Sequence, residues 1–279
     1  MTDTDSILFS TQDNIATITL NRPDSLNAMT NSLMKNLVDA LALVEQDKAI
    51  RVVVITGSGR GFCAGADLAG QANAEPSMAV PDGQVDDNFN GAMRAIYDCP
   101  VPTVARVNGA AAGGGFGLAM ACDITVAAKS AFFVATFGPR LGIVPDLGTT
   151  WNLPRKAGRA RALGLSLLGD RITAEQAESW GLIWKAVADE QLDAEVGRIT
   201  NSLAKTSAET VTRIRSVTDA ALGNSFSDQL DLEMVHQAVL IPRNMQEGAM
   251  AFMEKREPCL LYTSPSPRDR TRSRMPSSA

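Results

Sequence analysis

Hydrophobic and polar residues alternate over residues 14–20, NIATITL, so that Ala16, Ile18 and Leu20 share one face. This period of two predicts a half-buried strand. A turn-rich loop, NRPDSLNAM, follows, and Thr30 can then cap a helix. Leucines recur along that helix at the spacing of a single buried stripe, which consists of Leu33, Leu37, Leu41 and Val44.

The next segments alternate between apolar runs and glycine-rich loops. Residues 51–56, RVVVIT, are a continuous β-branched run, which predicts a strand buried on both faces. The glycine-rich segment 57–68 leads from it toward a helix. Further strands are predicted at 103–107 and 123–127, with a second glycine loop and a helix between them. This alternation to about residue 150 predicts an α/β fold with a mostly parallel sheet flanked by helices.

Beyond residue 158 the pattern becomes helical throughout. Thr173 and Gln176 fit a capping box, and further helices are predicted around 192–203, 208–222 and 227–240. The polar segment 70–88 predicts a flexible loop beside the site. Because no internal repeat and no strong linker precede residue 258, we interpret residues 1–258 as one domain, with its core to about residue 200 and a helical region at about 200–258.

The net charge of the chain narrows the classes of function that it could have. The 279 residues carry a net charge of -5, which argues against a nucleic-acid-binding protein with a basic face. The last 21 residues, Cys259–Ala279, are rich in Ser, Pro and Arg, and without them 22 basic and 30 acidic residues remain. We interpret 259–279 as a disordered, non-native tail, because such a composition cannot bury a core.

The cellular location is predicted from what the chain lacks. Its N-terminus, MTDTDSILFS, has neither the basic nor the apolar region of a signal peptide, and no apolar run of about 20 residues suggests a membrane span. Four widely spaced cysteines and one histidine favour neither a disulfide framework nor a metal site. We therefore expect a cytoplasmic protein with no membrane partner.

Two glycine loops, Gly57–Leu68 and Asn108–Gly117, each follow a buried strand. Such loops meet at the carboxyl ends of parallel strands, where ligands bind, and glycines let the backbone approach a ligand closely. Two N–H groups that converge on one oxygen would form an oxyanion hole. The alternative is that the glycines serve only tight turns and packing. Neither loop fits a dinucleotide- or phosphate-binding motif.

Four segments in register resemble the motifs of the crotonase (enoyl-CoA hydratase/isomerase) superfamily: IATITLNRPDSLNAM, VVVITGSGRGFCAGADL, VNGAAAGGGFGLAMACDI and LGIVPDLGTTWNLPR. The resemblance runs from about Ile7 to Pro258. It implies an α/β, ClpP-like spiral of ββα units with a helical C-terminal trimerisation region. It also implies an acyl-CoA substrate, a homotrimer or dimer of trimers, and no cofactor apart from the coenzyme A of the substrate.

The resemblance also assigns residues. Ala66 and Gly114 match the two backbone N–H donors of the oxyanion hole, which would hold the thioester oxygen as it becomes an enolate. Ala64, Asp67 and Leu68, together with those two donors, match positions that bind the coenzyme A moiety. For Asp67 we favour the alternative of an acidic helix cap.

The carboxylates depart from the hydratase pattern. A hydratase carries one Glu two residues after the glycine triplet, where this chain has Gly117, and a second Glu where it has Phe137–Arg140. No Asp or Glu occurs from Ile124 to Pro145. A two-carboxylate mechanism that activates water is therefore poorly supported.

Asp146 is the carboxylate that remains, in LGIVPDLGTTW. A single carboxylate beside a thioester α-carbon can remove a proton and return it elsewhere, which is the chemistry of an isomerase. Its pKa would have to be raised by a dry pocket for it to act as a base near neutral pH. The alternative is a structural Asp that binds the backbone of Gly148–Thr150.

The segment from Leu141 to Val187, with Trp180-Gly-Leu-Ile-Trp184, is most similar to the ring-1,2-epoxyphenylacetyl-CoA isomerase branch of the family. That resemblance implies conversion of an epoxide thioester to an oxepin thioester, and shifts of a β,γ double bond into conjugation (Δ3,Δ2-enoyl-CoA isomerase activity), with Asp146 as acid/base. Two alternatives stay open: an enoyl-CoA hydratase with atypical catalytic groups, and a non-catalytic acyl-CoA-binding subunit.

Several other residues invite functional interpretations. His236, the only histidine, lies outside every matched motif, so we expect a packing or surface role. Cys63 lacks an evident base and is expected to be a small core residue. Arg22, Arg60 and Arg155 could meet coenzyme A phosphates or could be surface charges.

Overall fold

The computed structural model describes residues 6–68 and 87–260. It divides the chain into two compact units, residues 1–201 and 202–279, which are described separately. Of the predicted loop 70–88, residues 70–86 lie outside the described residues and 87–88 belong to a helix. Residues 261–279, the greater part of the segment interpreted as a tail, also lie outside them. The single-domain interpretation of 1–258 stays a prediction.

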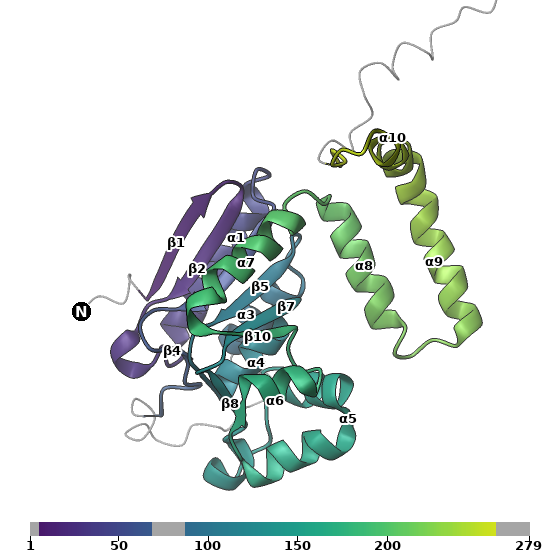
Figure 1. Cartoon of the computed structure of the whole chain (residues 1–279). Helices are drawn as coiled ribbons and strands as arrows, with labels where there is room; N and C mark the ends of the chain where they lie inside the picture. Colours follow the sequence, from purple (N-terminus) through teal and green to yellow (C-terminus); the bar gives the residue numbers. More distant parts are fainter. Residues whose placement is uncertain (1–5, 69–86, 261–279) are drawn as a thin grey trace, which may run out of the picture. The chain divides into compact units, whose positions relative to one another are not determined.

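The larger sheet of the first unit has six strands in the order β1-β2-β3-β5-β7-β10 (Figure 1). Strand β1 is antiparallel to β2, and all other neighbours are parallel. The strands are β1 (Ile7–Gln12), β2 (Ile15–Leu20), β3 (Val52–Gly57), β5 (Thr103–Val107), β7 (Ile124–Ala128) and β10 (Lys185–Val187). The predicted parallel α/β core is therefore confirmed.

Burial along the strands follows the residue pattern. In β2, Ala16, Ile18 and Leu20 are fully buried and alternate with partly exposed residues, as predicted. Strand β3 is buried along its whole length, as its continuous β-branched run predicts, and it pairs with β2 and β5. Val54, for example, pairs with Thr17 on one side and Val104 on the other.

A second sheet, in the order β4-β6-β8-β9, was not predicted. Its strands are β4 (Gly61–Cys63), β6 (Ala110–Ala112), β8 (Phe132–Val134) and β9 (Ile172–Thr173). The two glycine segments were interpreted as loops, but each contributes a strand of three residues, which is too short to show a period of two. The prediction that everything beyond residue 158 is helical is also wrong, since β9 and β10 lie there.

Two helices of the first unit begin where their capping residues predict. Thr30 Oγ1 accepts a hydrogen bond from Leu33 N at 3.1 Å and caps α1 (Asn31–Gln46). The Thr173 capping box at α6 (Ala174–Ser179) is also confirmed. The other helices are α3 (Asp87–Tyr97), which packs on α1, α4 (Gly114–Ala121), α5 (Thr149–Leu168) and α7 (Leu192–Leu203). Short helical turns occur at η2 (Pro23–Ser25), η4 (Phe137–Leu141) and η5 (Asp189–Gln191).

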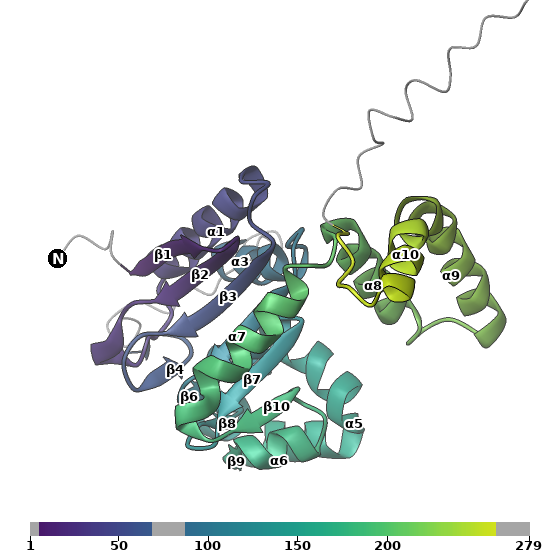
Figure 2. The same cartoon turned by 45° about the horizontal axis from the view of Figure 1, so that its top comes forward.

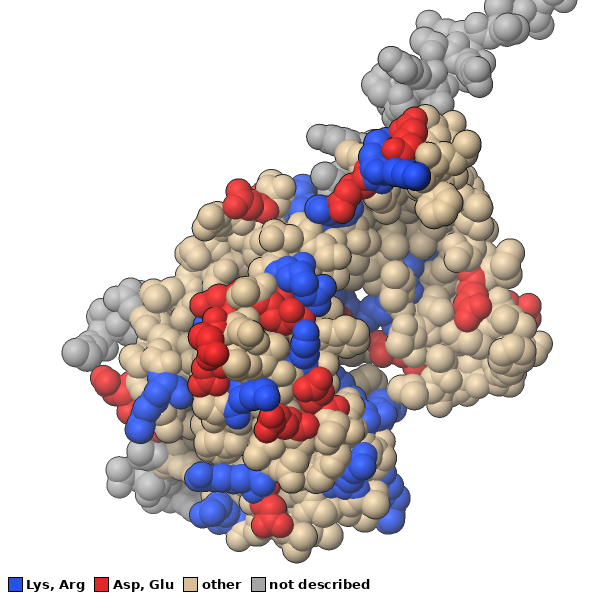
Figure 3. Space-filling model, viewed as in Figure 1, with Lys and Arg blue, Asp and Glu red and all other residues tan. Residues whose placement is uncertain are grey.

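Helix α7 runs in front of the larger sheet beside β7 (Figure 2). Arg106 on β5 donates from Nε to Asp193 Oδ1 at 2.7 Å, and Lys185 on β10 pairs with Glu195 at 3.2 Å. Acidic and basic side chains are interleaved around this helix (Figure 3). The visible face therefore carries paired charges rather than a basic patch.

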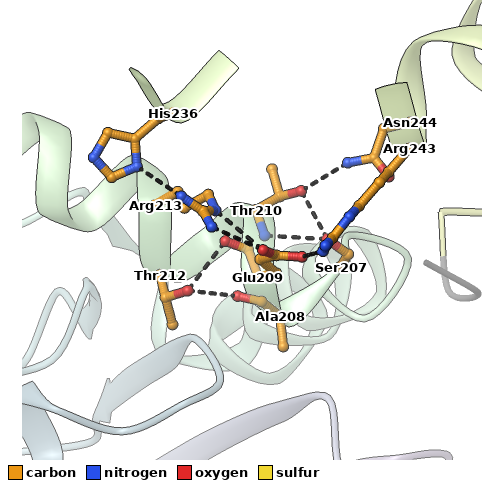
Figure 4. A network of polar contacts seen from close by, with 9 residues as sticks. All are labelled: Ser207, Ala208, Glu209, Thr210, Thr212, Arg213, His236, Arg243 and Asn244. Atoms are coloured by element: carbon orange, nitrogen blue, oxygen red, sulfur yellow. Dashed lines mark hydrogen bonds and ion pairs between the residues drawn. The ribbon is translucent and has the colours of Figure 1, made fainter. Parts of the chain in front are cut away.

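The second unit is helical in its described residues and contains α8 (Ala208–Ala220), α9 (Phe226–Leu240), the π-helical turn η6 (Ile241–Met245) and α10 (Gln246–Glu254). A polar network joins α8, α9 and η6 (Figure 4). At its centre, Glu209 accepts from Arg213 Nη2 at 2.9 Å and from Arg243 Nη1. His236 Nδ1 lies 3.3 Å from Arg213 Nη1.

Within residues 6–68 and 87–260, no helix is both long and apolar enough to cross a membrane. No group of three or more His, Cys, Asp or Glu side chains in these residues is placed to hold a metal ion.

Candidate active site

The loop that carries Ala66 is held by backbone pairing with Met29. Gly65 O accepts from Met29 N at 2.7 Å, and Asp67 N donates to Met29 O at 2.9 Å. Ala66 and Met29 therefore form an isolated parallel bridge. In such a bridge the residue between the two bonded neighbours turns its own N–H to the opposite side. The Ala66 N–H thus points away from Met29.

Gly114 begins α4 directly beside this loop. Gly65 adopts φ +88°, and a Cβ atom there would lie 2.8 Å from Ala112 O and 3.1 Å from Gly114 N. Only a residue without a side chain allows the two loops to come this close. Met29 joins the two loops again, because its Sδ would lie 3.1 Å from a Cβ atom at Gly114.

The backbone N–H groups of Ala66 and Gly114 donate to no acceptor within the described part of the chain. Gly114 is also the first residue of α4, where N–H groups have no partner inside the helix and the helix dipole favours negative charge. The two donors can hold an oxygen that gains negative charge in a reaction.

Asp146 lies in the turn that leads into α5. The next residue, Leu147, has φ +49° and is 7% exposed. Leu147 Cδ1 would lie 2.6 Å from a Cβ atom at Gly114, so the turn rests on the residue that supplies the second N–H donor. The sequence therefore places Asp146 one residue from a direct contact with the candidate oxyanion hole.

A backbone hydrogen bond closes the turn at Asp146. Thr149 N donates at 2.9 Å to the backbone oxygen of Asp146, and the carboxylate makes no described bond to the backbone of Gly148–Thr150. Partial burial raises the pKa of the Asp146 carboxyl above its ordinary value. Asp146 is nevertheless an exposed residue, as are its neighbours Ile143 and Val144, so the described residues do not form the dry pocket expected around a base.

Asp67 and Arg22 form an ion pair beside the Ala66 loop. Arg22 Nη2 lies 2.8 Å from Asp67 Oδ2, and Arg22 Nη1 donates to Ala28 O at 2.6 Å. Asp67 precedes Leu68, the last residue described before position 87, and the helix-cap interpretation of Asp67 stays a prediction. The Arg22 guanidinium is thus bound to protein groups, while Leu68 is 48% exposed and Ala64 is partly buried. A coenzyme A contact at Ala64, Ala66, Asp67, Leu68 or Gly114 stays a prediction.

The remaining candidates are described by their own burial and contacts. Cys63 is fully buried, as predicted, and burial raises the pKa of its thiol to about 12. His236 belongs to the polar network of the second unit. Arg155 stacks over the Trp151 ring at 4.1 Å, and Arg60 is exposed.

Three residues of the site architecture were missed in the sequence. Asn27 is fully buried at φ +58°, and its side chain accepts from Arg22 N and donates to the Ser58 and Gly61 carbonyl oxygens. Met29 and Leu147 join the loops described above. The placement of Asn27 inside the motif NRPDSLNAM was the available signal, whereas nothing in the sequence marks a leucine at positive φ.

Comparison with known proteins agrees with this architecture. The family model described as enoyl-CoA hydratase/isomerase matches residues 10–260. A 1,2-epoxyphenylacetyl-CoA isomerase of Escherichia coli (strain K12) is 42% identical over 255 residues, which cover 90% of this chain and 97% of that protein. A probable enoyl-CoA hydratase of Rhodobacter capsulatus is 38% identical, with 91% and 96% of the two chains covered.

A solved structure extends the similarity to the backbone. The crystal structure of an enoyl-CoA hydratase from Polaromonas sp. JS666 superposes with a TM-score of 0.84 at 34% identity, covering 90% of this chain and 98% of that chain. With the two glycine loops in contact and the motifs in register, the chain belongs to the enoyl-CoA hydratase/isomerase family, the crotonase superfamily.

Proposed function

We propose that this protein is an acyl-CoA isomerase that uses Asp146 as its acid/base group and the Ala66 and Gly114 N–H groups as its oxyanion hole. The observation that supports the proposal is the contact of Leu147 with Gly114, because it places Asp146, a carboxyl of raised pKa, one residue from a contact with the residue that supplies an N–H donor. The glycine at position 117 and the absence of Asp and Glu from residues 124–145 support a single-carboxylate mechanism.

The proposed double-bond shift needs only this one carboxylate. Asp146 removes a proton from the α-carbon of a β,γ-unsaturated thioester, and the electron pair moves onto the thioester oxygen. The two N–H groups stabilise that oxyanion, and one such donor typically contributes about 3–4 kcal/mol to the transition state. The protonated Asp146 then returns the proton to the γ-carbon. The electrons re-form the carbonyl and leave a conjugated double bond, so no atom is gained or lost.

The substrate proposal is 2-(1,2-epoxy-1,2-dihydrophenyl)acetyl-CoA, Δ3-enoyl-CoA thioesters, or both. The 42% identity to the Escherichia coli epoxyphenylacetyl-CoA isomerase supports the first. We further propose that the enzyme needs no cofactor beyond the coenzyme A of its substrate, and that it acts in the cytoplasm. A homotrimer or dimer of trimers is supported by exposed apolar residues of the second unit, where Phe226, Phe252 and Met253 are 81%, 86% and 81% exposed.

The test is Asp146→Asn, assayed on a β,γ-enoyl-CoA and on epoxyphenylacetyl-CoA. Loss of a general acid/base typically lowers the rate by about 10²–10⁴-fold. Asn preserves the size of the side chain, so thioester binding should persist and KM should change little. Full turnover by this variant would exclude Asp146 as the acid/base group.

The hydratase is the second candidate, because the Rhodobacter capsulatus relative carries that name. Strong hydration of crotonyl-CoA by the wild-type protein would favour it. A non-catalytic acyl-CoA-binding subunit would bind thioesters without exchanging their protons. Exchange of deuterium from solvent into the α- or γ-carbon of a bound thioester therefore separates the enzyme from the binding subunit.

A further inference from the structure

Two glycines on one face of α4 lie under the turn that carries Asp146. Gly114 and Gly117 are three residues apart, so they are neighbours on the helix surface. The Leu147 side chain covers Gly114, as described above. A Cβ atom at Gly117 would lie 2.7 Å from Leu147 O, 3.0 Å from Thr149 Oγ1 and 3.3 Å from Leu147 Cβ.

The close contact at Gly117 involves atoms that cannot easily move. Leu147 O is a backbone atom, and its residue already has the unfavourable φ of +49°. Thr149 is fully buried at the first position of α5, and its N–H is bonded to Asp146 O. A methyl group at residue 117 would therefore push away the whole turn from Asp146 to Thr149 rather than one flexible side chain.

We propose that Gly117 is a positioning residue that fixes the Asp146 carboxylate relative to the Gly114 N–H. This inference rests on the proposed role of Asp146 in the reaction. Because neither Gly114 nor Gly117 has a side chain, the turn from Asp146 to Thr149 can rest directly on α4 at these two positions. Gly117 thereby acts on the reaction through Asp146 and does not itself touch the substrate.

The same contacts restrict which residue types position 117 can hold. A side chain of any size there competes with the Leu147 carbonyl oxygen for space. A carboxylate on residue 117 and the observed Asp146 turn are therefore alternatives. Glycine at position 117 therefore leaves room for the turn that positions Asp146 for proton transfer.

The test is a double-mutant cycle with Gly117→Ala, Asp146→Asn and the double variant in the full-length protein. Gly117→Ala should lower kcat on a β,γ-enoyl-CoA by about 100-fold, as expected for a misplacement of about 1 Å, with KM little changed. If Gly117 acts through Asp146, the double variant should be no slower than Asp146→Asn, because the two effects share one cause. Gly164→Ala on α5 is the matched control, since a Cβ atom at Gly164 would meet nothing within 4 Å.

The outcomes separate this inference from the proposed function. Losses that multiply in the double variant, or a wild-type kcat in Gly117→Ala, would overturn the positioning role alone. A wild-type rate in Asp146→Asn would overturn the proposed function, whatever Gly117→Ala does. If circular dichroism shows that Gly117→Ala does not fold, Leu147→Ala takes its place in the double-mutant cycle. It removes the side chain over Gly114 and leaves residue 117 unchanged, and multiplying losses would again overturn the proposal.

Discussion

Arg22 joins the loop before α1 to the loop of Ala66 through Asp67, with Arg22 Nη2 2.8 Å from Asp67 Oδ2. The two side chains are only 25% and 20% exposed, and the guanidinium also donates to Ala28 O. Ala28 precedes Met29, whose backbone pairs with Ala66. The ion pair thus supports the same backbone segment that orients the Ala66 N–H.

Asp67→Asn should destabilise the protein by about 1–2 kcal/mol, because a half-buried guanidinium would lose its charged partner. Turnover of a thioester should fall with it, since the Ala66 loop loses one of its supports. Urea unfolding and kcat measure the two effects. Asp39→Asn is the control, because the Lys35–Asp39 pair is 66% and 61% exposed and should contribute less than about 1 kcal/mol. Equal losses in both variants would show that the Arg22 pair has no special structural role.

Asp146→Asn should make the folded protein more stable at neutral pH. The pKa of this carboxyl is raised by desolvation, so the folded state binds its proton more tightly than the unfolded state. Stability is therefore lost as the pH rises from the unfolded-state pKa through the folded-state pKa. The gain in Tm on substitution should be present at neutral pH and should vanish in acid below both pKa values. A variant that is less stable at neutral pH would instead indicate that the charged carboxylate has a stabilising partner.

The sequence predicts the parts of this fold that have a long and regular pattern. The buried run of β3, the alternating β2 and the stripe of α1 are all confirmed, because each buries enough residues to show its period. The three-residue strands β4 and β6 could not be found in this way, since their pairing is determined by contacts between distant segments. Strand β10 was missed for the same reason: its partner β7 lies about 60 residues earlier.

For the site, the sequence predicts two glycine loops that could meet, but it does not predict how closely their backbones approach each other. The contact between Gly65 and Gly114 N depends on φ +88° at Gly65, which glycine permits but does not require. Leu147 at positive φ is even less predictable, because leucine rarely adopts that conformation. The roles of Ala66, Gly114 and Asp146 in the reaction stay predictions until the variants are assayed.

Glu209→Gln should destabilise the second unit. Glu209 is 29% exposed and accepts from Arg213 and Arg243, and the hydrogen bonds from Arg213 contribute most to holding the pKa of its carboxyl below the usual range (Figure 4). A lowered pKa contributes stability above the unfolded-state pKa that is lost as the pH falls through the folded-state value. We expect a loss of about 1 kcal/mol at neutral pH that disappears in acid.

Thermal unfolding at several pH values measures the Glu209 effect. Glu233→Gln on α9 is the control, because Glu233 is exposed and has no charged partner among the described residues. A loss in Glu209→Gln that does not change with pH would show that packing, rather than the charge of Glu209, stabilises the network.

Thr149→Val and Thr125→Val should change stability in opposite directions, although both residues are buried. Thr149 Oγ1 makes no hydrogen bond in the described part of the chain, whereas Thr125 Oγ1 donates to Ala119 O at 2.7 Å. A buried hydroxyl without a partner costs about 1–3 kcal/mol, so its replacement by a methyl group should stabilise the protein. Loss of the Thr125 bond should instead cost about 1 kcal/mol. Urea unfolding of the two variants gives the sign of each change, and a loss of stability in Thr149→Val would show that its hydroxyl has a hydrogen-bond partner in solution.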